Sequence, residues 1–331
     1  MKRFIKFLRD NCLFLIIYVV VFSLLMVKFP YYIDAPGGLI NVDNRIEIEG
    51  GYLSSGSLNL AYVTEYEATL PMLFISLFKD DWDVYPKKSN EISDSYEDLL
   101  ARDRLWMKAS YANATILAYE KAGKEIEITD RELFVLYIYK EANTDLKVGD
   151  ELLSVEGKEI HDRKDLAQEI SSKKVGETIS LKVLHNGKEF DRTAEVLEID
   201  GTKIIGIVPS EIREYKANPS IKISYGDSES GPSGGLMVTL AIYNALVEED
   251  ITGGLTIVGT GTIESDGTVG EIGGVEYKLK GAVAKKADLF FVPAGVNYEE
   301  AIKLKEKKNY SITIVPVSTF DEALTYLKEN V

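Results

Sequence analysis

The stretch Gly231-Pro232-Ser233-Gly234-Gly235 is followed, 45 positions after its serine, by Lys278 in the run GGVEYK at residues 273–278. This pairing matters because both histidines of the chain, His161 and His185, lie upstream. If Ser233 is a nucleophile, its general base must therefore be another kind of side chain, and Lys278 is the candidate.

The residues around Ser233 predict a tight turn ahead of a helix. Pro232 has no N–H, and Gly234 and Gly235 have no side chains, so the serine would project from the turn. A helix N-terminus offers backbone N–H groups and partial positive charge, which a developing oxyanion needs. We expect Gly231 and Gly234 to support such an oxyanion site. The alternative is an ordinary serine N-cap.

Lys278 lies at the edge of an apolar helix face. On a helical wheel of residues 275–287, it falls about 60° from Val275, whereas Lys280 falls about 140° round on the polar face. A free lysine has a pKa near ~10.4, and a general base needs one of roughly 7–8. Burial at the edge of the apolar face can supply that shift. The alternative is a solvated surface lysine.

The last third of the chain alternates between strand-like and helix-like runs. Apolar strands are predicted at 203–208, 220–225, 255–258, 289–292 and 312–315, and helices directly after Ser233 and at 275–287, 298–307 and 319–328. Upstream, residues 57–63 alternate as a strand does, residues 96–122 carry a helical apolar stripe, and residues 79–95 read as a loop. The rest of 31–78 reads as extended segments with turns.

The two motifs together resemble the proteolytic domain of the Lon family, over at least residues 219–331. The resemblance implies a Ser–Lys dyad, with Ser233 as nucleophile and Lys278 as general base. Thr260 and Thr262 are the candidate supporting threonines. The resemblance leaves open which of Ser230, Thr260, Thr262 or Glu264 orients the lysine.

Residues 146–157, LKVGDELLSVEG, resemble the central motif of PDZ domains. The resemblance implies a peptide added as a strand beside 133–139 and against a helix at 162–171. The segment 129–135 departs from the family because it lacks the glycine of the carboxylate-binding loop. The alternative is a module that only packs or blocks access. A hairpin is predicted at 185–187.

The N-terminus predicts a membrane anchor. Basic residues at positions 2–9 precede an apolar run at 12–27, which favours a cytoplasmic N-terminus and an extracellular remainder. The alternative is a cleaved signal peptide, but residues 28–32 offer no small-residue cleavage site. The expected location is therefore the cell membrane, with a single pass.

The whole arrangement resembles the membrane-anchored PDZ–Lon peptidases of Gram-positive bacteria. No G-x-x-x-x-G-K-[ST] motif is present, so the resemblance implies ATP-independent cleavage of extracellular peptides or flexible segments, including secreted signalling peptides. The alternative function is a non-catalytic, membrane-tethered scaffold that binds peptides. The sequence leaves a homo-oligomer open.

We predict an α+β chain: a Lon-type proteolytic domain with an inserted PDZ-like domain and an N-terminal transmembrane helix. The predicted parts are a cytoplasmic tip and anchor (1–30), an N-terminal part of the protease domain (31–125), a PDZ-like domain (126–205) and the dyad-bearing part (206–331). The catalytic domain would be discontinuous. The net charge of −15 argues against nucleic acid, and one cysteine, Cys12, excludes a cysteine metal site. No cofactor or metal is expected.

Overall fold

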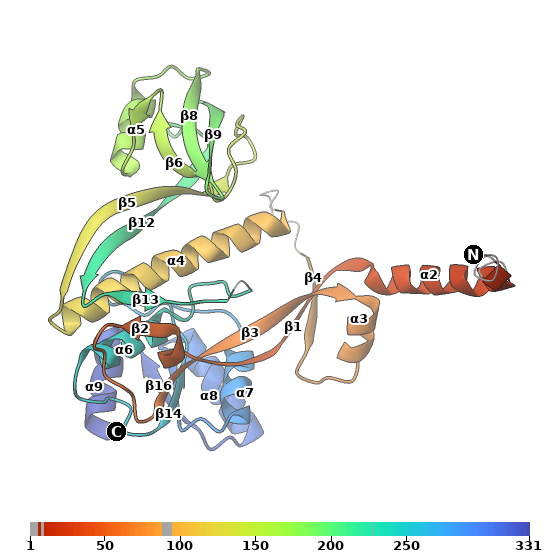
Figure 1. The fold of residues 1–331 in the computed structure, drawn as a ribbon, viewed down its shortest axis with the longest axis vertical. Helices are drawn as coiled ribbons and strands as arrows, with labels where there is room; N and C mark the ends of the chain where they lie inside the picture. The colour runs from red at the N-terminus through yellow and green to blue at the C-terminus, as the bar shows by residue number, and fades with distance from the viewer. Residues whose placement is uncertain (1–5, 8–9, 88–94, 227) are drawn as a thin grey trace.

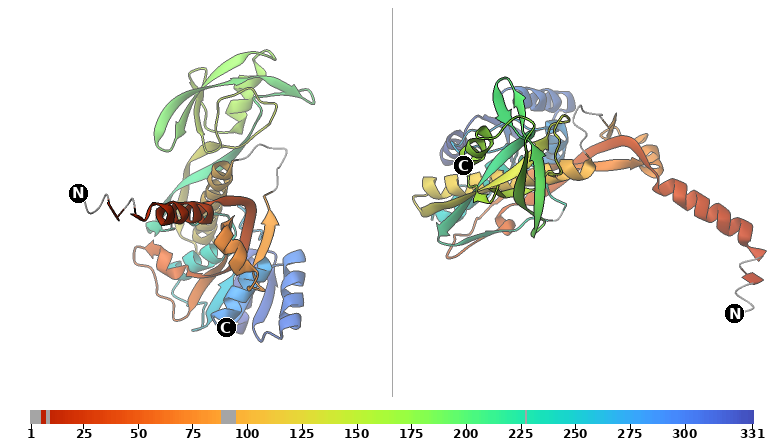
Figure 2. Two further views of the ribbon diagram at one scale, coloured as in Figure 1. Left: turned by 90° about the vertical axis from the view of Figure 1, so that its right-hand side faces the viewer. Right: turned by 90° about the horizontal axis from the view of Figure 1, so that it is seen from above.

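The computed structural model describes residues 6–7, 10–87, 95–226 and 228–331. It therefore leaves out most of the predicted cytoplasmic tip and residues 88–94 of the predicted loop. The first long helix, α2 (Cys12–Met26), projects away from the rest of the chain, and the views of Figures 1 and 2 agree on this. Its side chains are almost all apolar, and none of them is buried.

Within the described ranges, no helix reaches the length and apolarity that crossing a bilayer requires. The membrane anchor therefore stays a prediction.

One mixed sheet combines strands from the N-terminal part and the C-terminal part of the chain. Its strand order is β16-β15-β14-β3-β1-β4, and β14 pairs in parallel with both β3 and β15. The register sets Thr256 opposite Ser57 and Gly259 opposite Leu60. The strands are β1 (Lys28–Asn41), β3 (Ser57–Thr69), β4 (Asp83–Pro86), β14 (Thr256–Gly259), β15 (Leu289–Pro293) and β16 (Thr313–Val317).

Helices cover both faces of this sheet, which explains why β15 is buried along its whole length. Leu289 and Phe291 join a core with α4, α6 and α9, whereas Phe290 and Val292 join a second core with α7 and α8. The helices are α4 (Tyr96–Lys121), α6 (Gly235–Leu246), α7 (Val275–Ala284), α8 (Val296–Lys308) and α9 (Phe320–Asn330).

A second sheet has the strand order β12-β5-β6-β8-β9. Its two long strands, β5 and β12, form a ribbon that connects the first sheet to a separate small body (Figure 1). The ribbon consists of β5 and β12, which pair from Ile138 with Ile207 down to Glu125 with Asn218. The body has its own apolar core, including Val135, Leu166 and Leu181. Its elements are β5 (Glu125–Ile138), β6 (Glu151–Val155), β7 (Lys158–Glu159), α5 (Arg163–Ser171), β8 (Thr178–His185), β9 (Lys188–Glu195), β10 (Leu197–Ile199), β11 (Thr202–Ile204) and β12 (Ile207–Asn218).

Most predicted elements are present, and two regions differ. The predicted extended stretch 31–78 contains a helix, α3 (Leu70–Ser76), and the predicted loop 79–95 contains strand β4. β4 exists because it pairs with β1 on the outer edge of the sheet, a contact that local sequence does not report. A small pair of strands, β2 (Ile46–Ile48) and β13 (Ile221–Ile223), follows the short helix η1 (Asp43–Arg45).

Candidate active site

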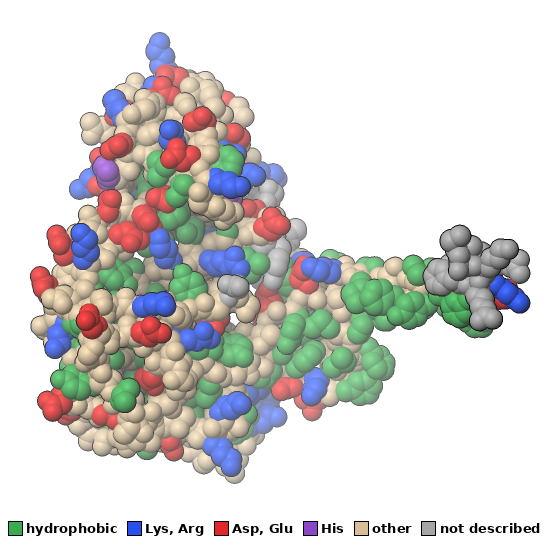
Figure 3. All heavy atoms as spheres, in the orientation of Figure 1, with side chains coloured by type: hydrophobic (Ala, Val, Ile, Leu, Met, Phe, Trp, Pro, Cys, Tyr) green, Lys and Arg blue, Asp and Glu red, His purple; other side chains and the backbone are tan. Residues whose placement is uncertain are grey.

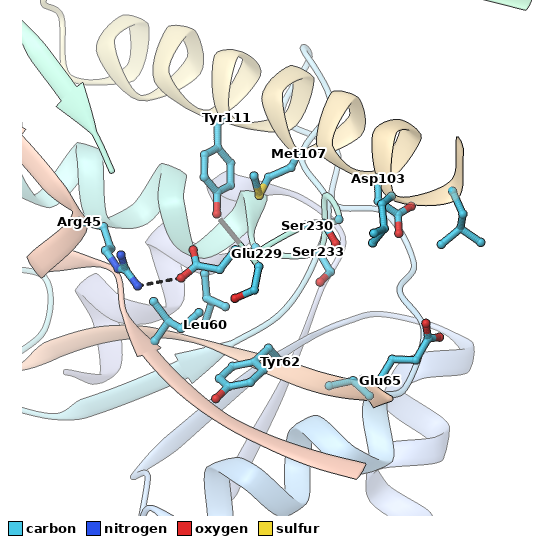
Figure 4. Close-up of a pocket in the computed structure, with 17 residues that line it drawn as sticks. Arg45, Leu60, Tyr62, Glu65, Asp103, Met107, Tyr111, Glu229, Ser230 and Ser233 are labelled. Carbon is cyan, nitrogen blue, oxygen red and sulfur yellow. Dashed lines mark hydrogen bonds and ion pairs between the residues drawn. The ribbon is translucent and has the colours of Figure 1, made fainter. Parts of the chain in front are cut away.

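A cleft of about 530 Å³ lies between α4, β3 and the loop that leads into α6. Figure 4 shows Met107 and Tyr111 of α4 facing Tyr62 of β3, with Ser233 between them. The cleft combines apolar walls with carboxylates. Its lining also includes Ile40, Arg45, Leu60, Val63, Glu65, Leu99, Leu100, Asp103, Ser228, Glu229, Ser230, Gly231 and Gly234.

Helix α4 holds the serine loop in place through two hydrogen bonds. The Gly231 N–H donates to the Asp103 carbonyl at 3.0 Å, and Ser110 Oγ donates to the Pro232 carbonyl at 3.1 Å. Gly231 has a φ of 91°, the left-handed region in which glycine costs least. Gly231 thus supports the loop, and its N–H is already bonded to the Asp103 carbonyl of α4.

Ser233 is not the N-cap of α6. Gly234 takes that position, with no side-chain cap, and Gly235 donates back to the Pro232 carbonyl at 3.1 Å. Among the described residues, no acceptor takes the N–H of Ser233 or Gly234. These two amides lie at the N-terminus of a helix, beside the Ser233 side chain.

Lys278 is buried, as its helical position predicts. Its exposed fraction is 3%, and Val275 and Leu279 on the same face of α7 belong to the core. Burial lowers the pKa of Lys278 to about 8 because desolvation disfavours the charged amine. Lys280 instead lies over the ring of Tyr277, 5.3 Å from its centroid.

Gly274 sets the start of α7. Its φ is 69°, and a Cβ there would lie 2.7 Å from Val63 Cγ2 of β3. Only glycine fits this close approach, which brings the first turn of α7 against the sheet and positions Lys278.

Thr260 joins the lysine to the serine. Its hydroxyl accepts a hydrogen bond from Lys278 Nζ at 3.0 Å and donates one to the Ser233 carbonyl at 3.1 Å. The Gly261 N–H donates to the same carbonyl at 2.8 Å. Lys278 is not among the described residues that line the cleft, and its side chain is linked to the Ser233 backbone through Thr260.

The other three candidates for orienting Lys278 lie elsewhere. The Thr262 N–H donates to the Gly270 carbonyl at 3.3 Å, and Glu264 is exposed. Ser230 is exposed at the cleft. Among the described residues, Thr260 is the one of these four candidates whose side chain bonds Lys278.

Sequence reasoning missed the wall that α4 builds. Asp103, Met107 and Tyr111 line the cleft although they lie more than 120 positions before Ser233. Burial raises the pKa of Tyr111 to about 12, so its phenol stays a hydrogen-bond donor at neutral pH. Beside it, Arg45 and Glu229 form an ion pair at 2.7 Å. No local motif marks these residues.

The structure of the separate body formed by β5–β12 contradicts one expectation about peptide binding. The edge of residues 133–138, where we expected an added strand, is paired with β12, and Leu133 lies opposite Glu211. β12 is instead the terminal strand of this sheet. Near it, the Arg163 N–H at the start of α5 donates to Glu211 Oε1 at 3.1 Å. The predicted hairpin is present, with positive φ at Asn186 and Gly187.

Comparison with known proteins assigns the two bodies to classes. Residues 130–197 match the model of the PDZ domain, and residues 220–329 match that of the Lon protease (S16) C-terminal proteolytic domain. The chain therefore carries a PDZ domain and a Lon-type proteolytic domain, and the latter indicates a serine peptidase. The matched range leaves out β3 and α4, which complete the sheet and the cleft.

Among curated proteins, a Lon protease of Neorickettsia sennetsu is 30% identical over 99 residues, 30% of this chain and 12% of that protein. The match thus spans only a small part of that relative. Among solved structures, the PDZ domain of an SdrC-like protein from Listeria monocytogenes is 25% identical, over 25% of this chain and 92% of that one, with a TM-score of 0.23. The second domain of another Listeria protein is 25% identical, over 25% and 88%, with a TM-score of 0.22.

The described residues contain no group of three or more His, Cys, Asp or Glu side chains that could hold a metal ion.

Proposed function

We propose that this chain is a membrane-anchored, ATP-independent serine endopeptidase that cleaves extracellular peptides or flexible segments with a Ser233–Lys278 dyad. The observation that carries the proposal is the buried Lys278, whose Nζ donates to Thr260 while Thr260 donates to the Ser233 carbonyl. A lysine with a pKa near 8 is neutral in an appreciable fraction of molecules at neutral pH, as a general base must be.

In the proposed mechanism, Ser233 Oγ attacks the scissile carbonyl carbon and Lys278 Nζ accepts its proton. The carbonyl oxygen becomes an oxyanion, which the Ser233 and Gly234 amides are free to bind. Collapse of this tetrahedral intermediate breaks the C–N bond of the substrate, and the protonated Lys278 gives its proton to the leaving amine. Water then attacks the acyl-serine ester, again with Lys278 as base, and frees the enzyme.

The cleft supports peptide segments as the substrate class. Its volume of about 530 Å³ suits a few side chains at a time, and it lies open between two elements. The PDZ domain supports peptide binding outside the catalytic cleft. We propose that it presents or gates such peptides, with the outer edge of β12 replacing the edge first expected. Secreted signalling peptides are one substrate group of this kind.

Membrane anchoring belongs to the proposal and rests on two observations. Residues 12–27 form an apolar run that follows basic residues, and the side chains of α2 are not covered by the described chain. With the N-terminus in the cytoplasm, both folded bodies would lie outside the cell.

The test is cleavage of an unstructured peptide by the purified full chain without ATP, read by mass spectrometry. We expect Ser233→Ala and Lys278→Ala to abolish cleavage. The matched control, Lys280→Ala on the same helix, should cleave as the parent does. The dyad is refuted if both dyad variants keep the parent rate. A parent that cleaves no peptide but binds one would favour the scaffold.

A further inference from the structure

Helix α3 presents an apolar face to the outside of the molecule. Phe74, Leu77 and Phe78 are 63%, 77% and 73% exposed, and Leu70 is 47% exposed. Leu70 and Phe74 lie about one helical turn apart on α3, and Leu77 and Phe78 lie in the turn that follows it. The rings of Phe74 and Phe78 pack edge to face, with centroids 5.3 Å apart. A surface helix of a soluble domain normally turns a polar face outward, so a contiguous exposed apolar face marks an interaction surface.

This apolar face is continuous with α2. The two helices contact one another, although 44 positions separate Met26, the last residue of α2, from Leu70, the first residue of α3. Figure 3 shows hydrophobic side chains gathered over α2 and over the region below its base, where Figure 1 places α3. Whatever surrounds the end of α2 must therefore also meet α3.

Aromatic residues border the apolar face on the side of the sheet. Tyr66 of β3 stacks on Trp82, with ring centroids 5.9 Å apart, and Tyr31 of β1 is 40% exposed. Tyrosine and tryptophan concentrate at the level of lipid headgroups, where one end of the ring is apolar and the other is wet.

Charge attraction does not explain how the apolar face of α3 would bind a partner. After Phe78 come Lys79, Asp80 and Asp81, so the segment that follows α3 carries more negative than positive charge. Lys87 nearby is paired with Glu67 at 2.7 Å. Attraction to anionic headgroups is therefore weak, and burial of apolar side chains is the available driving force.

We propose that α3 with residues 77–78 enters the headgroup–acyl boundary of the bilayer that receives α2. This inference rests on the membrane anchoring proposed above. A single helix leaves the attached domain free to tilt and rotate, whereas a second contact fixes the height and direction of the cleft. Lipid is favoured over a second copy of the chain because the face is continuous with α2 and bordered by aromatic residues.

The two tryptophans of the chain provide the probe. In full-chain protein reconstituted into phosphatidylcholine vesicles with brominated acyl chains, Trp106→Phe leaves only Trp82, beside α3. Trp82→Phe leaves only Trp106, whose ring packs edge to face against Tyr137. We expect bromolipid to quench Trp82, with greatest effect for bromines about 5–10 Å below the headgroups. Trp106 should keep its fluorescence. Added salt should not relieve the quenching.

Two variants separate α3 from the anchor. Phe74→Ser with Phe78→Ser should reduce Trp82 quenching while the protein still floats with the vesicles and still cleaves peptide. Phe74→Leu with Phe78→Leu should retain the quenching. Unquenched Trp82 in a chain that floats refutes the α3 contact but leaves the anchor intact. A chain that does not float with vesicles refutes the anchor and this inference together. Unquenched Trp82 with Phe78→Cys cross-links between copies would assign the face to a second copy instead.

Discussion

Lys278 Nζ donates a hydrogen bond to Thr260 Oγ1 at 3.0 Å. Thr260 itself is fully buried and follows the end of β14, whereas Lys278 lies on the second turn of α7. One hydroxyl thus fixes the amine and, through its own proton, the carbonyl of Ser233. The bond leaves the lone pair of a neutral Lys278 free to accept a proton, because the amine uses one of its hydrogens on Thr260.

The lowered pKa of Lys278 predicts the pH dependence of cleavage. Only the neutral amine can act as base, so kcat/KM should rise with pH, reach half its maximum near pH 8 and level off above. Below the midpoint it should fall about tenfold per pH unit. The measurement is a pH–rate profile on an uncharged, unstructured peptide. A rate independent of pH between about 6 and 9 would contradict the role of Lys278 as base.

The same shift predicts that Lys278 destabilises the fold. Its pKa falls from 10.5 in the unfolded chain to about 8 in the folded one, so the unfolded chain binds the proton more tightly. The penalty is therefore complete below pH 8, shrinks as pH rises and is absent above 10.5.

At pH 7 this penalty is on the order of 3 kcal/mol, and the hydrogen bond to Thr260 offsets about 1 kcal/mol of it. Lys278→Met should therefore raise the free energy of unfolding by about 2 kcal/mol at pH 7. The gain should disappear at pH 10.5. Urea denaturation at both pH values measures this, with Lys280→Met as control. Equal midpoints for parent and Lys278→Met at pH 7 would show that burial does not penalise the amine.

Thr260→Val should lower kcat while leaving KM nearly unchanged. Valine keeps the shape of threonine but loses both hydrogen bonds, worth together about 2 kcal/mol, or about 30-fold in rate. Thr260→Ser should keep most of the activity because it retains the hydroxyl. Thr262→Val is the matched control, since Lys278 Nζ donates to the hydroxyl of Thr260 and Thr262 lies two positions further along the same loop. If the two valine variants lose the same amount of activity, Thr260 has no special role in positioning the dyad.

Gly235→Ala should destabilise the contact between α4 and α6. A Cβ at this position would lie 2.3 Å from Ser110 Oγ and 2.9 Å from the backbone nitrogen of Ile263. The expected loss is about 1–3 kcal/mol, measured by thermal or urea unfolding. Adding Ser110→Ala removes the clashing hydroxyl and should restore only part of the loss, because the Ile263 backbone remains and the bond from Ser110 to the Pro232 carbonyl is gone. Gly273→Ala has open space around its Cβ and should be tolerated; an equal loss there would point to a general effect of glycine replacement.

Much of the secondary structure follows from local sequence. The predicted helix at 96–122 is α4 at Tyr96–Lys121, which starts with a Ser95 capping box and ends before Gly123. Strand β3 contains the predicted 57–63 but continues to Thr69. The extension of β3 and the strand β4 both pair with β1, and no periodicity of the sequence reports that pairing.

The sequence by itself determined the chemistry that Ser233 and Lys278 can offer. A Gly-rich turn before a helix and a lysine at the edge of an apolar face are properties of adjacent residues, and helical geometry is enough to derive them. Only the tertiary structure decided that Thr260 rather than Thr262 bonds the lysine, that α4 closes the cleft and that β12 occupies the expected peptide edge. These are contacts between residues far apart along the chain, which packing of the two cores brings together.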